Sequence, residues 1–341
     1  MIEVLHPGTL TTLQDLEHQD HEHLGVPPAR AADAFGLRIA NRLVGNTDDA
    51  GALEMTAEGA RLRFEDEMCI AFSGGTLAPL LDGEPLPMHQ TVTVKAGAEL
   101  DCGRVLEGWR CYLAVAGGIQ AQPVLGSVSS DTLAGLGPEP LAAGMRLAIG
   151  ALAGPAPAFY MKSPPRYAGA VRLRVLPGPQ HDWFAPETLL ALRESVYTAS
   201  SKSDRTGVRL EGTVLPRAQE SELPSMGMVT GAVQVPGSGR PLILLTNHGA
   251  TGGYPVIANV ISADLPLLAQ LAPGAEVRFT DVGRAEALTA LREQEARLER
   301  DIIAADTGLL AARALMSLAG SHASLRQAAV NSGAVRVRIK K

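Results

Sequence analysis

The sequence has 341 residues, of which 46% are hydrophobic, and a formal net charge of −6 at pH 7. This length exceeds a single ordinary core and predicts two domains with a tail. The excess of acidic over basic residues argues against nucleic acid or an anionic membrane as a general partner.

The three cysteines, Cys69, Cys102 and Cys111, are odd in number and lack C-x-x-C spacing. They therefore predict reduced core thiols rather than disulfides or a zinc site. The opening residues MIEVLHPG do not resemble a signal peptide, because Glu3 and Pro7 interrupt them. No apolar run approaches the ~20 residues needed to cross a bilayer. The sequence predicts a soluble, cytoplasmic protein with no membrane partner.

The first part of the chain reads as a β-rich domain over residues 1–150. Its short apolar runs, broken by Gly, Pro and Asp, favour a closed or sandwiched β structure. The expected elements are a strand at 1–6, a segment too polar for a core element at 9–25, a helix at 33–44 with Phe35, Ile39 and Leu43 at helical spacing, and strands over 52–118.

A second domain is expected at residues 166–282, after an Ala- and Pro-rich linker at 151–165. A strand at 171–176 and a helix at 186–197 follow the order of the first domain. Five short echoes between the two parts occur in the same order at offsets of roughly 156 to 177 residues. The shared order indicates an internal duplication.

Residues 225–260 contain two strand-like runs, 231–235 and 241–245, and predict a hairpin. The second run opens into the glycine-rich segment TNHGATGGYP at 246–255. Glycine lets a ligand approach the backbone, while Thr, Asn, His and Tyr supply hydrogen-bonding groups. The segment is either a ligand-binding loop or an ordinary surface turn.

Residues 283–341 are expected to form a helical tail. Leu288, Leu291, Leu298 and Ile302 make the apolar stripe of an amphipathic helix, which we expect to pack against its own domain in preference to a partner. The alternation in residues 335–339 predicts an edge strand.

Two clusters suggest chemistry. Residues 14–23 contain three histidines, His18, His21 and His23, and four carboxylates, but their spacing matches no defined metal motif. We therefore expect no specific metal site. Residues 201–212 contain two arginines and a lysine, which indicate either an acidic small-molecule ligand or internal ion pairs.

Several motifs are absent. Neither G-x-x-x-x-G-K-[ST] nor G-x-S-x-G occurs, and Met161-Lys162 lacks the Ala-Met-Lys-Met context of a biotin carrier. The chain is expected to bind no nucleotide and to carry no biotin of its own.

A longer series of motifs runs along the chain: Thr12-Leu13-Gln14-Asp15, His23-Leu24-Gly25-Val26-Pro27, Ala40-Asn41-Arg42-Leu43-Val44-Gly45-Asn46, Tyr112-Leu113-Ala114-Val115-Ala116-Gly117-Gly118, Ser203-Asp204-Arg205, Arg209-Leu210-Glu211-Gly212, Gly231-Ala232-Val233-Gln234-Val235-Pro236 and Thr251-Gly252-Gly253-Tyr254-Pro255. Together they resemble the biotin-dependent carboxyltransferase family. That family includes KipA, the C-type component of bacterial 5-oxoprolinase and the allophanate-hydrolase-subunit-2-like domain of urea carboxylase.

The resemblance implies a mainly β protein with tandem cyclophilin-like β-barrel lobes and a ligand cleft between them. It implies a KipI or 5-oxoprolinase B-type partner, and an A-type subunit in a complex that opens 5-oxo-L-proline to L-glutamate with ATP bound by a partner. Two alternatives are open: a carboxyltransferase that uses carboxybiotin from another chain, as in urea carboxylase, and a KipA-like regulator that binds a kinase inhibitor.

The resemblance also implies which residues form the site. Those expected to act in catalysis are Arg205, Arg209, Thr251 and Tyr254, with both arginines holding a carboxylate. Those expected to bind ligand are Gln14, Asp15, Asp33, Asn41, Ser203, Gln234, Asn247, His248, Gly252 and Gly253. The chain departs from the family pattern at Glu17-His18-Gln19-Asp20, at Ala29-Arg30, at Val128 and at Asn247.

Overall fold

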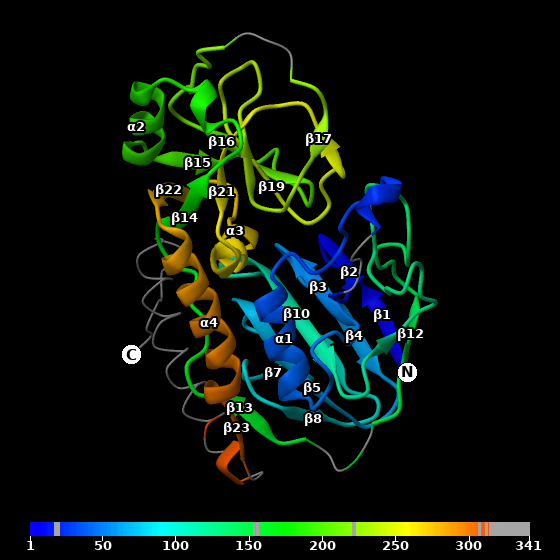
Figure 1. Cartoon of the computed structure of the whole chain (residues 1–341). Helices are drawn as coiled ribbons and strands as arrows, with labels where there is room; N and C mark the ends of the chain where they lie inside the picture. The colour runs from blue at the N-terminus through cyan, green and yellow to red at the C-terminus, as the bar shows by residue number, and fades with distance from the viewer. Residues whose placement is uncertain are drawn as a thin grey trace, which may run out of the picture.

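The computed structural model describes residues 1–16, 21–152, 154, 157–219, 223–305, 308–310 and 313 (Figure 1). Within these residues the protein is mainly β with few helices, as expected. Residues 17–20, which include His18, and the strand expected at 335–339 lie outside the described residues.

The first half of the chain forms two open sheets. One has the strand order β11 (Ile119–Gln120), β12 (Arg146–Ile149), β1 (Ile2–His6), β4 (Arg61–Phe64), β9 (Glu99–Asp101), β6 (Leu80–Leu81) and β7 (Glu84–Pro85). The other has the order β2 (Leu10–Gln14), β3 (Ala52–Thr56), β10 (Glu107–Val115), β5 (Met68–Thr76) and β8 (Val92–Val94).

The two sheets share one apolar core, and the side chains of β10 show how it is built. Cys111, Leu113 and Val115 point into the core between the sheets. The alternate residues Tyr112 and Ala114 belong to a second cluster on the opposite face. Because side chains alternate along a strand, one sheet can bury both of its faces. Helix α1 (Ala34–Leu43) covers that second face.

The second half forms a closed seven-stranded barrel. Its strand order is β14 (Val171–Pro177), β21 (Val256–Val260), β18 (Ala232–Gln234), β19 (Leu242–Leu244), β16 (Gly207–Glu211), β15 (Tyr197–Ala199) and β22 (Glu276–Asp281). The predicted hairpin is confirmed, because β18 and β19 pair antiparallel with Val233 opposite Ile243. The barrel has its own apolar core.

The remaining elements lie around these sheets. The small strand pairs are β13 (Phe159–Met161) with β23 (Ile302–Ala304) and β17 (Met226–Gly227) with β20 (Thr251–Gly252). The other helices are η1 (Glu22–Leu24), η2 (His181–Trp183), α2 (Pro186–Glu194), η3 (Ser262–Asp264), α3 (Leu265–Ala269) and α4 (Arg284–Asp301).

Helix α4 contacts both halves rather than the second alone. It runs from the barrel along α1 (orange in Figure 1). Ala290 packs on Ile261 and Ala263 of the second half, whereas Leu298 packs into the α1 cluster of the first. The predicted apolar stripe is wrong in part, because Leu288 is 43% exposed and Ile302 begins a strand after the helix ends.

Three other boundaries differ from the expectations. The polar segment after residue 6 contains β2, in which the Thr11 hydroxyl donates to the Pro7 carbonyl oxygen and Gln14 Nε2 donates to the Thr12 hydroxyl. The expected linker contains β13, which pairs with β23. Helix α2 ends at Glu194, ahead of β15.

No helix in the described part of the chain is long and apolar enough to cross a membrane.

Candidate functional site between the two halves

Arg205 connects the two halves and is only 4% exposed. From the loop before β16 it donates through Nη1 to Oε1 of Glu54, in the middle of β3. Its Nη2 donates to the Arg30 carbonyl oxygen at 2.8 Å, and its Nε donates to Oδ1 of Asn247 at 3.3 Å. All three guanidinium nitrogens are bonded within the protein. Burial lowers the pKa of Arg205 to about 10.

Glu54 is the acceptor at the centre of this contact and is 1% exposed. Its Oε2 accepts from the Tyr112 hydroxyl at 2.6 Å and from the Ala32 N–H at 2.8 Å. Nε of Arg110 lies 3.6 Å from its Oε1. Hydrogen bonds and two arginine charges thus replace the lost hydration of this carboxylate. Glu54 holds the loop before β16 against the first half.

A second connection joins Asp33 to Gln270. Gln270 Nε2 donates to Oδ2 of Asp33 at 2.8 Å and to the Arg110 carbonyl oxygen at 2.8 Å. Asp33 Oδ1 accepts from the Gly36 N–H at 2.7 Å and caps α1. Burial raises the pKa of Asp33, and the hydrogen bond from Gln270 opposes that shift. Asp33 therefore lies between the halves, and both of its carboxylate oxygens are bonded within the protein.

Unsatisfied polar atoms gather beside the first connection. Asn247 Nδ2 donates to Oδ1 of Asp131 at 3.0 Å, and Gln14 Nε2 donates to the Ser130 carbonyl oxygen at 3.1 Å. Along these segments lie five of the ten buried side-chain polar atoms without a hydrogen-bond partner in the described chain: Gln14 Oε1, Ser130 Oγ, Asp131 Oδ2, Thr246 Oγ1 and His248 Nε2. Buried polar atoms are normally bonded, so this concentration marks a place suited to water or a ligand.

His248 is 1% exposed and has one ring nitrogen engaged. Its Nδ1 lies 2.8 Å from the Gly249 carbonyl oxygen, which can only accept, so Nδ1 carries the proton. Burial lowers the pKa of His248. The neutral ring therefore presents Nε2 as an unbonded acceptor.

Asp15 organises the loop at residues 127–129, which contains Val128, one of the departures from the family pattern. Its carboxylate accepts from the hydroxyls of Ser127 and Ser129 at 2.7 Å each and from the Val128 N–H at 2.7 Å. The Val128 contact uses the backbone, so it does not depend on the side chain at that position. Asp15 positions the loop carrying Asp131, which reaches Asn247 of the second half.

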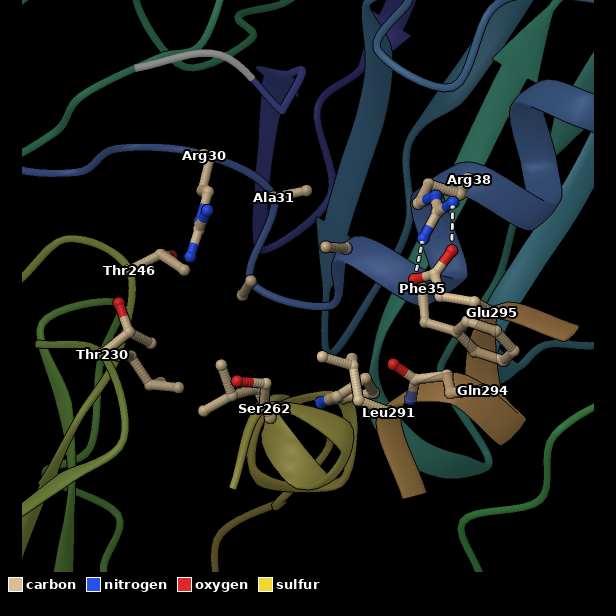
Figure 2. A pocket seen from close by; sticks show the side chains of 15 residues that line it. Arg30, Ala31, Phe35, Arg38, Thr230, Thr246, Ser262, Leu291, Gln294 and Glu295 are labelled. Atoms are coloured by element: carbon tan, nitrogen blue, oxygen red, sulfur yellow. Dashed lines mark hydrogen bonds and ion pairs between the residues drawn. The ribbon is translucent and has the colours of Figure 1, made fainter. Parts of the chain in front are cut away.

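A cavity of about 170 Å³ lies next to this layer, where both halves and α4 meet (Figure 2). Its walls come from the segment before α1 and α1 itself, from the loops of the barrel, and from α4. The polar and charged residues that line it are Arg30, Arg38, Thr230, Thr246, Ser262, Gln294 and Glu295. Pockets for drug-sized ligands measure about 300–1,000 Å³, so a cavity of about 170 Å³ has room only for a smaller molecule.

Other expected site residues lie outside this cavity and the buried layer. Arg209 is exposed on β16, so the structure does not pair it with Arg205 around a common ligand. Tyr254 is 49% exposed, and Thr251 and Gly253 are also exposed. Ser203 accepts from the Arg209 N–H at 3.1 Å and shapes its own turn.

Three further residues serve local structure. Asn41 donates to the carbonyl oxygen of Ala50 at 2.8 Å and holds the turn after α1. Gln234 donates to Met228 Sδ at 3.1 Å. A Cβ on Gly252 would meet that Gln234 amide at 2.7 Å, so glycine allows the close packing there.

Sequence reasoning missed Glu54, Asp131, Gln270 and Arg30 as site residues. A charged residue within the buried run of β3 was a usable signal for Glu54, because unpaired charges are rarely buried. Gln270 and Asp131 carried no such signal, since their partners are 237 and 116 residues away.

In the described ranges no group of three or more His, Cys, Asp or Glu residues is placed to hold a metal ion. The expectation for the histidine cluster stays a prediction, because His18 is not described.

The comparisons with known proteins agree with this architecture. The family model described as "Carboxyltransferase domain, subdomain A and B" matches residues 24–281. The chain belongs to this family.

Two curated relatives match over nearly their full length, and both are the C-type component of a bacterial 5-oxoprolinase. The chain is 36% identical over 303 residues to the one from Escherichia coli, covering 88% of this chain and 97% of that protein. It is 33% identical to the one from Haemophilus influenzae, with 88% and 97% covered. A urea amidolyase of Saccharomyces cerevisiae is 31% identical, but the match covers only 17% of that protein.

Solved structures show the same fold. TTHA0988 has a TM-score of 0.76 at 39% identity, covering 82% of this chain and 55% of that one. The urea amidolyase of K. lactis has a TM-score of 0.82 at 29% identity, covering 87% of this chain and 20% of that one. The chain therefore spans about half of the first structure and a fifth of the second.

Proposed function

We propose that this chain is the C-type component of a 5-oxoprolinase-like complex, which converts 5-oxo-L-proline to L-glutamate with ATP. The observation that carries the proposal is the 36% identity to the C-type component of the Escherichia coli 5-oxoprolinase, of which 97% is covered. The urea amidolyases, in contrast, contain a matching region of less than a fifth of their length. The chain would act with a B-type partner and an A-type subunit, and a partner would bind ATP.

In this proposal the lactam occupies the cavity between the halves. The cavity is small, combines apolar walls such as Phe35 and Leu291 with several polar groups, and borders the layer of unbonded buried atoms. Such a combination of apolar wall and few polar groups is typical of small-molecule sites.

We further propose that residues 1–150 and 166–282 are cyclophilin-like lobes derived by duplication, separated by a linker at 151–165 and followed by a tail at 283–341. Separate apolar cores in the two halves support this division. The same proposal places the complex in the cytoplasm, in keeping with three cysteines that form no disulfide.

A second candidate is a carboxyltransferase that receives the carboxyl group from carboxybiotin of another chain. The description of the family and the TM-score of 0.82 to K. lactis urea amidolyase favour it. A KipA-like regulator of a kinase inhibitor would need no substrate at all, and no observation here favours it over the enzymes.

The test is co-expression of the chain with B-type and A-type subunits, followed by an assay of glutamate release from 5-oxo-L-proline with and without ATP. The proposal expects release that requires ATP and all three chains. Carboxyl transfer from carboxybiotin, with no release of glutamate, would favour the carboxyltransferase and contradict the 5-oxoprolinase proposal.

A further inference from the structure

Three charged side chains line the cavity, and two of them are already paired. Arg38 donates to both carboxylate oxygens of Glu295, at 2.6 and 2.7 Å (dashed in Figure 2), and also to Asp48 at 2.9 Å. These contacts join α1 to α4 at the rim. The charges of Arg38 and Glu295 are thereby satisfied and leave little attraction for a ligand.

Arg30 is the third charged residue, and its guanidinium makes no hydrogen bond or ion pair with any described residue. Its backbone carbonyl oxygen is engaged by Arg205, which fixes the position of the chain at this point. In Figure 2 its side chain extends toward Thr246 of the second half. Burial lowers the pKa of Arg30, and the charge of Glu22 only partly opposes this shift.

Thr246 supplies an independent sign of a missing partner in the same wall. The residue is 2% exposed and lines the cavity, yet its hydroxyl has no partner in the described chain. A buried hydroxyl without a partner is destabilising, and a bound acceptor would remove that cost. Rotation about χ1 exchanges its methyl and hydroxyl groups at the cavity wall.

We propose that Arg30 is the anion-binding residue of the cavity, that Thr246 hydrogen-bonds the same ligand, and that the ligand is a small molecule with a carboxylate group. A planar guanidinium binds a carboxylate with two parallel hydrogen bonds. Arg205 cannot bind this carboxylate, because its guanidinium already bonds Glu54. Arg209 is exposed outside the cavity. The identity of the ligand as 5-oxo-L-proline rests on the proposed function; the anion site does not.

The experiment measures binding by calorimetry, on the full chain alone and on the chain co-purified with its B-type partner. The probes are 5-oxo-L-proline, 2-pyrrolidinone, which is the same ring without the carboxylate, and acetate. The variants are Arg30→Met, Arg30→Lys and Thr246→Val, with Arg240→Met as a matched control at an exposed arginine in the turn between β18 and β19.

Arg30→Met is expected to weaken binding of 5-oxo-L-proline about 10- to 100-fold, the range for loss of a charge-assisted hydrogen bond. Arg30→Lys recovers part of the affinity, Thr246→Val loses about 5- to 10-fold, and Arg240→Met binds like the unmodified protein. 2-Pyrrolidinone binds at least about tenfold more weakly than 5-oxo-L-proline, and Arg30→Met does not alter its affinity.

Equal binding of both lactams, unchanged affinity in Arg30→Met, or no binding of any carboxylate probe to either preparation would overturn the inference. Acetate binding that depends on Arg30, without binding of 5-oxo-L-proline, would uphold the anion site and contradict the proposed function. Glutamate release with an unchanged KM for 5-oxo-L-proline in Arg30→Met would uphold the proposed function and contradict the anion site.

Discussion

Glu54 illustrates how single buried charges hold the two halves together. It faces Arg205 and Arg110, and all three side chains are at most 4% exposed. Glu54→Gln would keep the shape but leave two arginine charges without their carboxylate. We expect it to lower the free energy of unfolding by about 3–5 kcal/mol, measured by urea denaturation.

Glu99→Gln is the matched control, because Glu99 bonds Arg63 on the surface. Exposed ion pairs contribute about 1 kcal/mol or less. Adding Arg205→Met to Glu54→Gln should restore part of the stability, since one unpaired charge is then removed. Equal losses in the free energy of unfolding for Glu54→Gln and Glu99→Gln would contradict the proposed role of Glu54 in joining the two halves.

His89 provides a pH test at the same scale. The residue is half-buried, but its Nε2 is enclosed and unbonded, and the loss of hydration lowers the pKa of His89 to about 4. The folded protein therefore binds this proton less tightly than the unfolded chain does. The contribution of His89 to stability is complete above about pH 6.5 and is lost as the pH falls toward 4, by about 3 kcal/mol in all.

His89→Asn removes the titration and suits the backbone, because φ is +58° at this position and asparagine tolerates that region. We expect the variant to lose less stability between pH 6.5 and 4 than the unmodified protein, as followed by urea denaturation at each pH. The exposed His23→Asn is the control. A variant with the same acid dependence as the unmodified protein would refute this account.

The roles of single residues were the hardest feature to predict from the sequence. The resemblance implied a cleft lined by Asp15, Asp33 and Asn247. Asp33 and Asn247 bond across the two halves, whereas Asp15 bonds the loop at residues 127–129 of its own half. The resemblance did not distinguish Arg205, which is engaged by Glu54, from Arg30, whose side chain is not. That distinction depends on partners more than a hundred residues apart, which no local pattern contains.

Helix α4 forms one wall of the cavity. Leu298 is 1% exposed in the cluster under α1, while Leu291, Gln294 and Glu295 of the same helix line the cavity. Leu298→Ala should lower the free energy of unfolding by about 2–5 kcal/mol through lost packing. It should also weaken ligand binding, because the α4 wall loosens.

Leu288→Ala, at a residue that is 43% exposed on α4, should change stability by about 0.5 kcal/mol or less. Chemical denaturation and calorimetry of both variants check this difference. Similar losses in the two variants would indicate that α4 contributes only its helical propensity.

Among the elements, helical spacing predicted α1 well, since Phe35, Ile39 and Leu43 of the expected apolar stripe are all buried in the helix. The turn chemistry predicted the hairpin of β18 and β19. Strand β2 was missed because its threonines and glutamine look exposed in sequence but bond within the fold. The far end of α4 was misplaced because the chain there pairs with β13 instead of continuing as helix.

At the scale of the whole molecule, the mainly β architecture followed from the frequent short strands and turns. One closed barrel is present in the described chain, in the second half, whereas the strands of the first half divide between two sheets. Closure depends on pairing between strands far apart in sequence, such as β14 with β22. The sequence could not predict the position of the cavity, because its lining residues come from both halves and from α4 and lie far apart in the chain.

The most direct test of the account is a crystal structure of the chain with its B-type partner and 5-oxo-L-proline. We expect the ligand in the cavity between the halves, with its carboxylate within hydrogen-bond distance of the Arg30 guanidinium. A ligand bound in another subunit, or on the surface near Arg209, would contradict it.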